Sequence, residues 1–126
     1  MLLVDTNIII NYLRGDSKAT DFIQAFGKQN LALSIIVEME LYNGVLNRVE
    51  YLRIKKELTD FVRLDLNENI GQTALFLSKQ YALSHHMSIA DTLIAATALV
   101  YGLELRTYNL KDFRFIPTLK VNSDLK

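Results

Sequence analysis

The chain opens with LLVDTNIIINYL, residues 2–13, where an apolar run changes abruptly into the composition of a helix start. Leu2–Val4 predicts a short buried strand. Asp5-Thr6-Asn7 consists of residue types that cap helix N-termini, and an apolar helix over residues 8–13 follows before Gly15. The chain therefore begins with a strand that leads directly into a helix.

This alternation continues through the chain. Helices are expected over residues 17–26, 35–46, 51–61, 68–83 and 88–101, strands over 31–33, 62–66 and 103–106, and an edge strand over 115–121 around Pro117. Short strands that alternate with helices predict an α/β fold with a parallel sheet covered on both faces. Ligands bind beyond the carboxyl ends of strands in such folds, and Asp5 stands at such an end. We therefore expect the first strand to be central.

Length and composition narrow the class of protein. With 126 residues and no linker-like segment, residues 1–126 are expected to form one domain. There is no cysteine, which excludes disulfides, thiolate catalysis and cysteine-bound zinc and fits a cytoplasmic location. The uncharged run 92–103 is too short to cross a bilayer, and the N-terminus has no signal-peptide pattern, so no membrane role is expected. The 14 basic and 14 acidic residues cancel, which weakens a nucleic-acid reading unless basic residues cluster locally.

Four acidic residues stand where strands or helices would direct them toward one point: Asp5, Glu40, Asp91 and Asp112. Gathered carboxylates repel each other, and each like pair at ~4 Å costs on the order of 4 kcal/mol at an effective dielectric of about 20. Such a cluster persists if the pKa values rise or if a cation neutralises it. Hard oxygen ligands suit Mg²⁺ or Mn²⁺, and those metals point to phosphate chemistry.

Each acid also has a purely structural interpretation. Asp5-Thr6-Asn7 supplies a helix cap, and Thr6 or Asn7 could fill that role while Asp5 faces a cleft. Glu40 could be a solvated helical glutamate, Asp91 completes the capping box Ser88-Ile89-Ala90-Asp91, and Asp112 lies with Asn109 in a turn-rich segment. Asp91 favours a functional role because it opens an apolar helix that is expected to be buried.

Other candidate motifs are weaker. His85 and His86 are read as loop residues, because no third histidine or cysteine completes a zinc site. Arg48, Arg53 and Lys55-Lys56 form either a solvated helix face or a rim that contacts RNA. The sequence has no Gly-x-Ser-x-Gly elbow and no glycine-rich phosphate loop.

Four segments in this order resemble the PIN-domain family, in particular its VapC-type toxins: Val4 to Asn7, Ser34 to Leu41, Ile89 to Leu99 and Thr107 to Phe113. The resemblance implies a three-layer α/β/α sandwich with Mg²⁺ or Mn²⁺ in an acidic pocket. It implies metal-ligand and catalytic roles for Asp5, Glu40 and Asp91, with Asp112 closing the site. Relatives place the last acid where either Asn109 or Asp112 stands, and here only Asp112 is charged. Thr6 or Asn7 would orient Asp5.

The resulting hypothesis is a metal-dependent endoribonuclease that acts as the toxin of a toxin–antitoxin pair. The resemblance further implies an RNA substrate, a VapB-like antitoxin and a homodimer. Arg14, Lys111 and Arg114 flank the acidic segments and are candidates for phosphate contacts. The alternatives are a nuclease outside such pairs, an inactive interaction module, and an acid-pocket phosphatase or phospho-acceptor domain. A phosphatase would require an aspartate where Asn7 stands.

Overall fold

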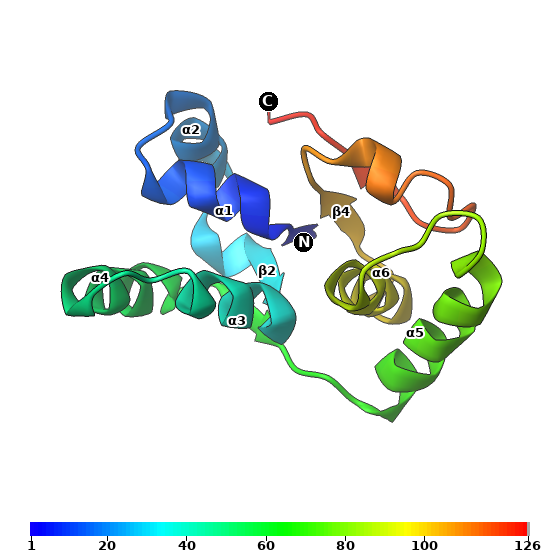
Figure 1. Ribbon diagram of the computed structural model, residues 1–126. Helices are drawn as coiled ribbons and strands as arrows, with labels where there is room; N and C mark the ends of the chain where they lie inside the picture. The colour runs from blue at the N-terminus through cyan, green and yellow to red at the C-terminus, as the bar shows by residue number, and fades with distance from the viewer. Residues whose placement is uncertain (126) are drawn as a thin grey trace.

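The structure is a computed structural model, and it describes residues 1–125 as five short parallel strands and six α-helices in the described part of the chain (Figure 1). The strands are β1 (Leu2–Val4), β2 (Leu31–Ser34), β3 (Val62–Leu64), β4 (Glu104–Arg106) and β5 (Val121–Asn122). The α-helices are α1 (Thr6–Leu13), α2 (Ser17–Phe26), α3 (Ile35–Asn43), α4 (Arg48–Leu58), α5 (Glu68–Tyr81) and α6 (Ile89–Tyr101). Two 3₁₀ turns, η1 (Lys28–Asn30) and η2 (Leu110–Asp112), complete the elements.

The strands form one sheet in the order β3-β2-β1-β4-β5, and every neighbouring pair is parallel. The central position expected for β1 is therefore confirmed. Leu3 pairs with Ala32 on one side and with Leu105 on the other. Val4 pairs with Arg106, so the residues that follow these two strands, Asp5 and Thr107, emerge side by side at the same edge of the sheet.

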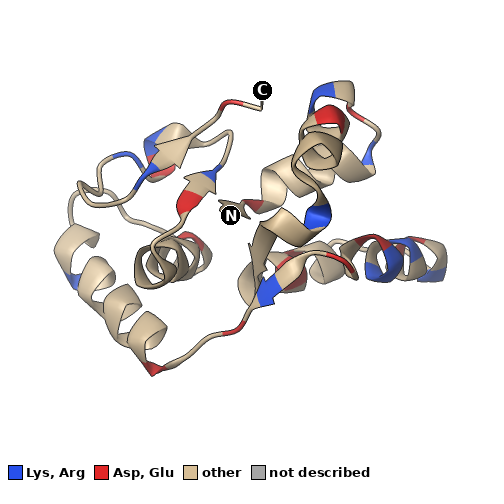
Figure 2. Cartoon of the chain, turned by 180° about the vertical axis from the view of Figure 1, so that it is seen from behind, with Lys and Arg blue, Asp and Glu red and all other residues tan. Residues whose placement is uncertain are grey.

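Helices cover both faces of the sheet, which confirms the three-layer α/β/α arrangement. Figure 1 shows α1 and α2 on one side of β1 and β4, and α5 and α6 on the other. All four residues of β2 are buried, as expected for a strand covered on both faces. The core residues of α6 include Ile94, Ala95 and Ala96, none of which has exposed surface. Figure 2 shows α6 almost without charge, whereas α4 carries basic and acidic turns close together.

Side-chain caps define the helix starts. Asn47 Oδ1 accepts a 2.9 Å hydrogen bond from the Glu50 backbone N–H, and Asn67 Oδ1 accepts the equivalent bond from Ile70. Each satisfies one of the donors that a helix start leaves unpaired. The helix predicted over 51–61 is thus wrong at both ends, because the Asn47 cap starts α4 at Arg48 and the helix ends at Leu58. The helices predicted to reach residues 46 and 83 end earlier, at Asn43 and Tyr81.

The predicted edge strand over residues 115–121 is also wrong in its extent. Only Val121–Asn122 pairs with β4, and the preceding residues form turns stabilised by bonds such as Leu119 N–H to the Ile116 carbonyl, 3.1 Å. Pro117 lies exposed within these turns and not in a strand. Two apolar residues of this segment, Ile116 and Leu119, are buried because they cover the core, which explains the strand-like composition.

Across residues 1–125 no helix combines the length and apolar character that crossing a bilayer requires.

Candidate functional site

The candidate site lies at the carboxyl ends of the central strands β1 and β4. The Asp5 backbone N–H donates a 2.9 Å hydrogen bond to the Arg106 carbonyl, which continues the ladder one residue beyond β1. Parallel strands present their last residues at one edge of the sheet, where ligands bind in α/β folds. The sheet therefore brings the first and last segments of the predicted site together.

Asp5 is both the cap of α1 and a buried member of the site. Its side-chain Oδ1 accepts a 2.7 Å hydrogen bond from the Thr6 N–H, and its Oδ2 accepts one of 2.7 Å from Thr107 Oγ1. Only 5% of Asp5 is exposed. Of the three capping candidates Asp5, Thr6 and Asn7, Asp5 is the N-cap residue of α1. The two interpretations of Asp5 are compatible, since capping uses one carboxylate oxygen.

Thr107 is a positioning residue that the sequence reasoning did not single out. Its side chain is fully buried, and its Oγ1 accepts hydrogen bonds from Asn7 Nδ2 at 3.3 Å and from the Asn109 N–H at 3.1 Å while donating to Asp5. The sequence feature that could have identified Thr107 is its position directly after the strand β4. A hydroxyl residue at the end of the strand beside β1 faces the same edge as Asp5.

Glu40 is exposed but held in place. Thr6 Oγ1 donates a 2.8 Å hydrogen bond to Glu40 Oε1, which links the first turn of α1 to α3. Glu38, two residues earlier, faces the other way, is buried, and pairs with Arg63 at 2.5 Å. Thr6 thus contacts both acids, Asp5 through its backbone N–H and Glu40 through its hydroxyl.

Asp91 lies in the first turn of α6 and is half-buried. Burial, and then the negative charges of Asp5, Asp112 and Glu40, raise the pKa of Asp91 from 3.8 to about 6. The serine half of the capping box predicted around it is present, because Ser88 Oγ accepts a 3.0 Å hydrogen bond from the Asp91 N–H. Asp91 therefore takes part in the start of α6 and is also a carboxyl group whose ionised form is disfavoured.

The pKa of Asp5 is raised as well, chiefly because the carboxyl group is buried. The hydrogen bonds from Thr107 and Thr6 act against that rise, and the charges of Glu40 and Asp112 add to it. The charges of Glu40 and Asp112 are therefore close enough to raise the pKa values of both Asp5 and Asp91. Asp5 and Asp91 carry the electrostatic cost of this arrangement.

Asp112 ends η2, and its backbone N–H bonds to the Asn109 carbonyl at 3.0 Å. Its charge raises the pKa values of both Asp5 and Asp91. Asn109 contributes through its backbone, which donates to Thr107, and its side chain is exposed. Of the two candidates for the last acidic position, Asp112 is the one whose charge reaches the other acids.

The donor set fits a hard divalent cation in its chemistry, because it consists of carboxylate oxygens, and the pKa values of two of them, Asp5 and Asp91, are raised. Within residues 1–125, however, no three histidine, aspartate or glutamate side chains are already gathered closely enough to hold a metal ion. Like charges without a cation repel, so a relaxed spacing is the expected state of such a set. A bound cation would have to draw these side chains together.

A groove of about 310 Å³ opens beside Glu40, between α1, α3 and α4. Its apolar wall includes Ile10, Leu41 and Ile54, and its charged lining includes Arg14 and Arg53. Arg14 is thus placed near Glu40, while Lys111 and Arg114 are exposed on either side of Asp112.

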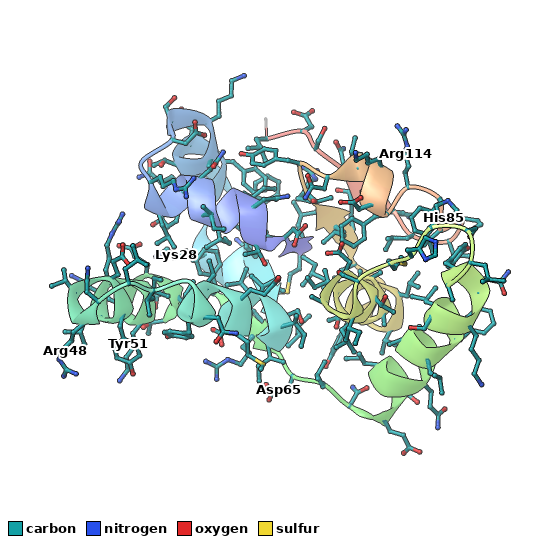
Figure 3. All side chains as sticks on the ribbon, viewed as in Figure 1. Lys28, Arg48, Tyr51, Asp65, His85 and Arg114 are labelled. Atoms are coloured by element: carbon teal, nitrogen blue, oxygen red, sulfur yellow. The ribbon has the colours of Figure 1, made fainter. Side chains whose placement is uncertain are left out.

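The histidines lie in the loop that precedes Asp91, and neither belongs to the set of four acids. Residues 85 and 86 are exposed in the connection between α5 and α6, as predicted for loop residues. Figure 3 shows His85 at the right-hand side of the view, above α5.

Comparison with known proteins agrees with this architecture. The PIN-domain family model matches residues 2–116. Ribonuclease VapC10 of Mycobacterium tuberculosis is 34% identical over 122 residues, which cover 95% of this chain and 91% of that protein. Ribonuclease VapC19 of the same organism is 31% identical over 123 residues, covering 95% and 98%. A solved toxin–antitoxin complex from Klebsiella pneumoniae superposes with a TM-score of 0.81 at 32% identity, covering 98% of this chain and 97% of that chain.

The chain therefore belongs to the PIN-domain family, in its VapC-type branch. The resemblance inferred from the four sequence segments is confirmed.

Proposed function

We propose that this chain is a Mg²⁺- or Mn²⁺-dependent endoribonuclease that hydrolyses phosphodiester bonds in RNA and acts as the toxin of a toxin–antitoxin pair in the cytoplasm. The observation that carries the proposal is that Asp5 stands at the carboxyl end of the central strand β1, where the charges of Glu40 and Asp112 raise the pKa values of both Asp5 and Asp91. Relatives that match nearly the whole chain are named ribonucleases, which supports the same reaction class.

Asp5, Glu40, Asp91 and Asp112 would hold the cation. When bound, a divalent cation supplies a water of lowered pKa as the nucleophile and offsets charge on the scissile phosphate. Asp5 is oriented for this role by the hydrogen bonds from Thr6 and Thr107. No histidine is assigned a proton-transfer role, in keeping with the position of His85 and His86 outside the acidic set.

Asn7, the second residue of α1, supports the site. Its Nδ2 donates to Thr107 Oγ1 at 3.3 Å, and its Oδ1 accepts from the Tyr108 N–H at 3.4 Å. Asn7 therefore helps to set the direction of the hydroxyl that holds Asp5. Partners of this kind fix ligand orientation in metal sites.

Substrate contacts are proposed for three exposed basic residues around the acids, Arg14, Lys111 and Arg114. Phosphate oxygens accept hydrogen bonds from such side chains, and neutralising them offsets the repulsion between an acidic pocket and RNA. This arrangement reconciles a net charge of zero with nucleic-acid binding.

A VapB-like antitoxin is the proposed protein partner, and a homodimer is the proposed state of the toxin. The groove beside Glu40 suits an antitoxin segment with apolar residues for the wall formed by Ile10, Leu41 and Ile54. A basic side chain in that segment would meet Glu40 at the end of the groove. One solved neighbour is a toxin–antitoxin complex, which supports this kind of partner.

The test is cleavage of total RNA and of labelled single-stranded RNA by the purified chain in Mn²⁺, with EDTA and Asp91→Asn as the two ways of removing the site. We expect cleavage that both changes reduce by at least about 100-fold. Asp21→Asn, an exposed aspartate on α2, is the matched control and should cleave normally. Equal cleavage by wild type and Asp91→Asn would rule the proposed site out.

Induced expression in a bacterial host distinguishes a catalytic toxin from an inactive interaction module. The wild-type chain should arrest growth, and Asp91→Asn should not. Arrest by both proteins would assign the effect to binding instead of catalysis.

A further inference from the structure

Three rings that the proposed mechanism does not use pack together beside the acidic segments. The His85 ring stacks on Phe115 with centroids 3.7 Å apart and planes 13° from parallel. Tyr81 meets both rings edge-on, at 5.6 Å from His85 and 4.8 Å from Phe115. Such geometries are favourable for aromatic pairs and hold each ring in one orientation.

The outermost ring of this cluster is fixed in place yet open to solvent. Ser84 Oγ and His85 Nδ1 are 2.7 Å apart, which restrains rotation of the imidazole. Phe115 covers one face of that ring and Tyr81 contacts its edge, while the residue as a whole remains exposed. Phe115 stacks on one face of the imidazole, and no ring contact is found on the opposite face within residues 1–125.

The stack joins the two segments that carry the later acids. Phe115 follows Asp112 by three residues, a separation of at most about 11 Å along a fully extended chain. His85 precedes Asp91 by six residues, in the loop that leads into α6. The stack therefore joins the loop that leads to Asp91 to the segment that follows Asp112.

Basic residues accompany the stack. Arg114 immediately precedes Phe115, and Lys111 precedes Asp112; both are exposed. Figure 3 shows Arg114 and His85 on the same side of the molecule. Aromatic rings interleaved with basic side chains are the surface that single-stranded nucleic acid recognises, because bases stack on rings while phosphates meet cations.

We propose that His85, supported by Phe115 and Tyr81, is a stacking platform for one base of the single-stranded RNA substrate next to the scissile phosphate. The proposal rests on the proposed ribonuclease function and adds a substrate-positioning residue to it. On this proposal, the protein recognises an unpaired base that is turned out of the RNA strand and stacks on His85.

Binding is tested separately from cleavage, in the Asp91→Asn background, by the fluorescence anisotropy of a short labelled single-stranded RNA of mixed sequence. His85→Ala should weaken binding by about 5-fold to 150-fold, the range that removal of one base–aromatic contact produces. His85→Phe retains a ring that can stack and should bind within about 3-fold of the parent, because stacking tolerates a change of ring. His86→Ala, which removes the neighbouring exposed histidine outside the stack, should leave binding unchanged.

In the active chain, His85→Ala should raise KM and leave kcat and the melting temperature nearly unchanged. Unchanged RNA binding by His85→Ala, or an equal loss in His86→Ala, would overturn the platform. A loss of kcat or of melting temperature in both His85→Ala and His85→Phe would instead assign His85 a role in loop structure and also overturn it. The two proposals can fail separately. If the wild-type chain does not cleave RNA but its RNA binding still depends on the His85 ring, only the proposed nuclease activity is contradicted.

Discussion

Thr107 Oγ1 donates a 2.7 Å hydrogen bond to Oδ2 of Asp5, although 102 positions separate the two residues in the chain. The bond is buried and joins the end of β4 to the end of β1. It is one of the two hydrogen bonds that oppose the effect of burial on the pKa of Asp5. The ionised form of a buried carboxylate thus depends on a hydroxyl group from the other end of the chain.

Thr107→Val removes this hydroxyl while keeping the shape of the side chain. We expect the free energy of unfolding at pH 7.5 to fall by about 1.5–3 kcal/mol, because a charged group loses a hydrogen bond in a buried place. Urea denaturation measures this loss. Thr107→Ser restores the donor and should recover most of the stability. A stability of Thr107→Val equal to that of the wild type would mean that the hydrogen bond to Asp5 does not contribute to the free energy of unfolding.

Asp91→Asn should stabilise the metal-free chain near neutral pH. Because the folded pKa of about 6 exceeds the ordinary 3.8, the folded state binds the extra proton between these values. The stability of the wild type therefore falls as pH rises from about 4 to about 6 and stays low above that. The full shift corresponds to about 3 kcal/mol, which screening at this half-buried position reduces to about 1 kcal/mol.

The measurement is thermal unfolding of wild type and Asp91→Asn in EDTA from pH 4 to pH 8. The difference between the proteins should be small at pH 4 and reach its full size above pH 6. Excess Mn²⁺ should reverse the order at pH 7.5, since only the wild type keeps the ligand. A variant less stable than wild type in EDTA at pH 7.5 contradicts the electrostatic argument.

Thr6→Val should weaken metal binding more than it weakens the fold. The hydroxyl orients Glu40, an exposed side chain, so its loss should cost less than about 1 kcal/mol of stability. Residues that orient metal ligands typically contribute 10- to 100-fold in metal affinity, and we expect a decrease of about 10-fold here. Calorimetric titration with Mn²⁺ tests this, with Thr6→Ser as the variant that keeps the hydroxyl. Unaltered affinity in Thr6→Val would show that Glu40 needs no such support.

Glu57→Gln should loosen α4, which forms one side of the groove beside Glu40. Glu57 Oε2 accepts hydrogen bonds from the Tyr12 hydroxyl at 2.6 Å and from Lys28 Nζ at 3.0 Å, and these bonds lower its pKa. The resulting stability exists above the ordinary pKa of 4.5 and is lost as pH falls through the lower folded value. At pH 7 the variant should be about 1 kcal/mol less stable, since the pair is partly exposed.

Urea denaturation at pH 7 and at pH 3.5 checks this expectation, because the difference between Glu57→Gln and wild type should shrink at the lower pH. Glu68→Gln, an exposed glutamate at the start of α5, serves as the control and should change stability little at either pH. A difference independent of pH would remove the charge of Glu57 as the cause.

Local patterns in the sequence were sufficient for the class of fold. Apolar triplets followed by capping residues predicted β1 and β2 close to their observed places, because a strand buried on both faces must be apolar throughout. The strand-like segment Leu103 to Arg106 predicted β4. Helix boundaries were predicted less well. Asn47 starts α4 earlier than its charged pattern indicated, since a single side-chain hydrogen bond decides where a helix begins.

Local sequence was also enough to name Asp5, Glu40, Asp91 and Asp112 as candidates, because an isolated charge at the edge of an apolar element carries a desolvation cost that invites explanation. The sequence favoured Glu40 over Glu38, because the two side chains lie on different faces of the same helix. Only the packed structure sends Glu38 to Arg63 and Glu40 to Thr6, since those partners come from other elements.

The order of residues along the chain was thus enough for the kind of sheet, the central strand and the acids of interest, because burial and capping act over a few neighbouring residues. Contacts between distant segments arose only when the sheet aligned β1 with β4 and placed Thr107 beside Asp5. The stacking of His85 on Phe115 has the same origin. Side-chain partners of this kind depend on which strand ends become neighbours, and that is a property of the assembled fold.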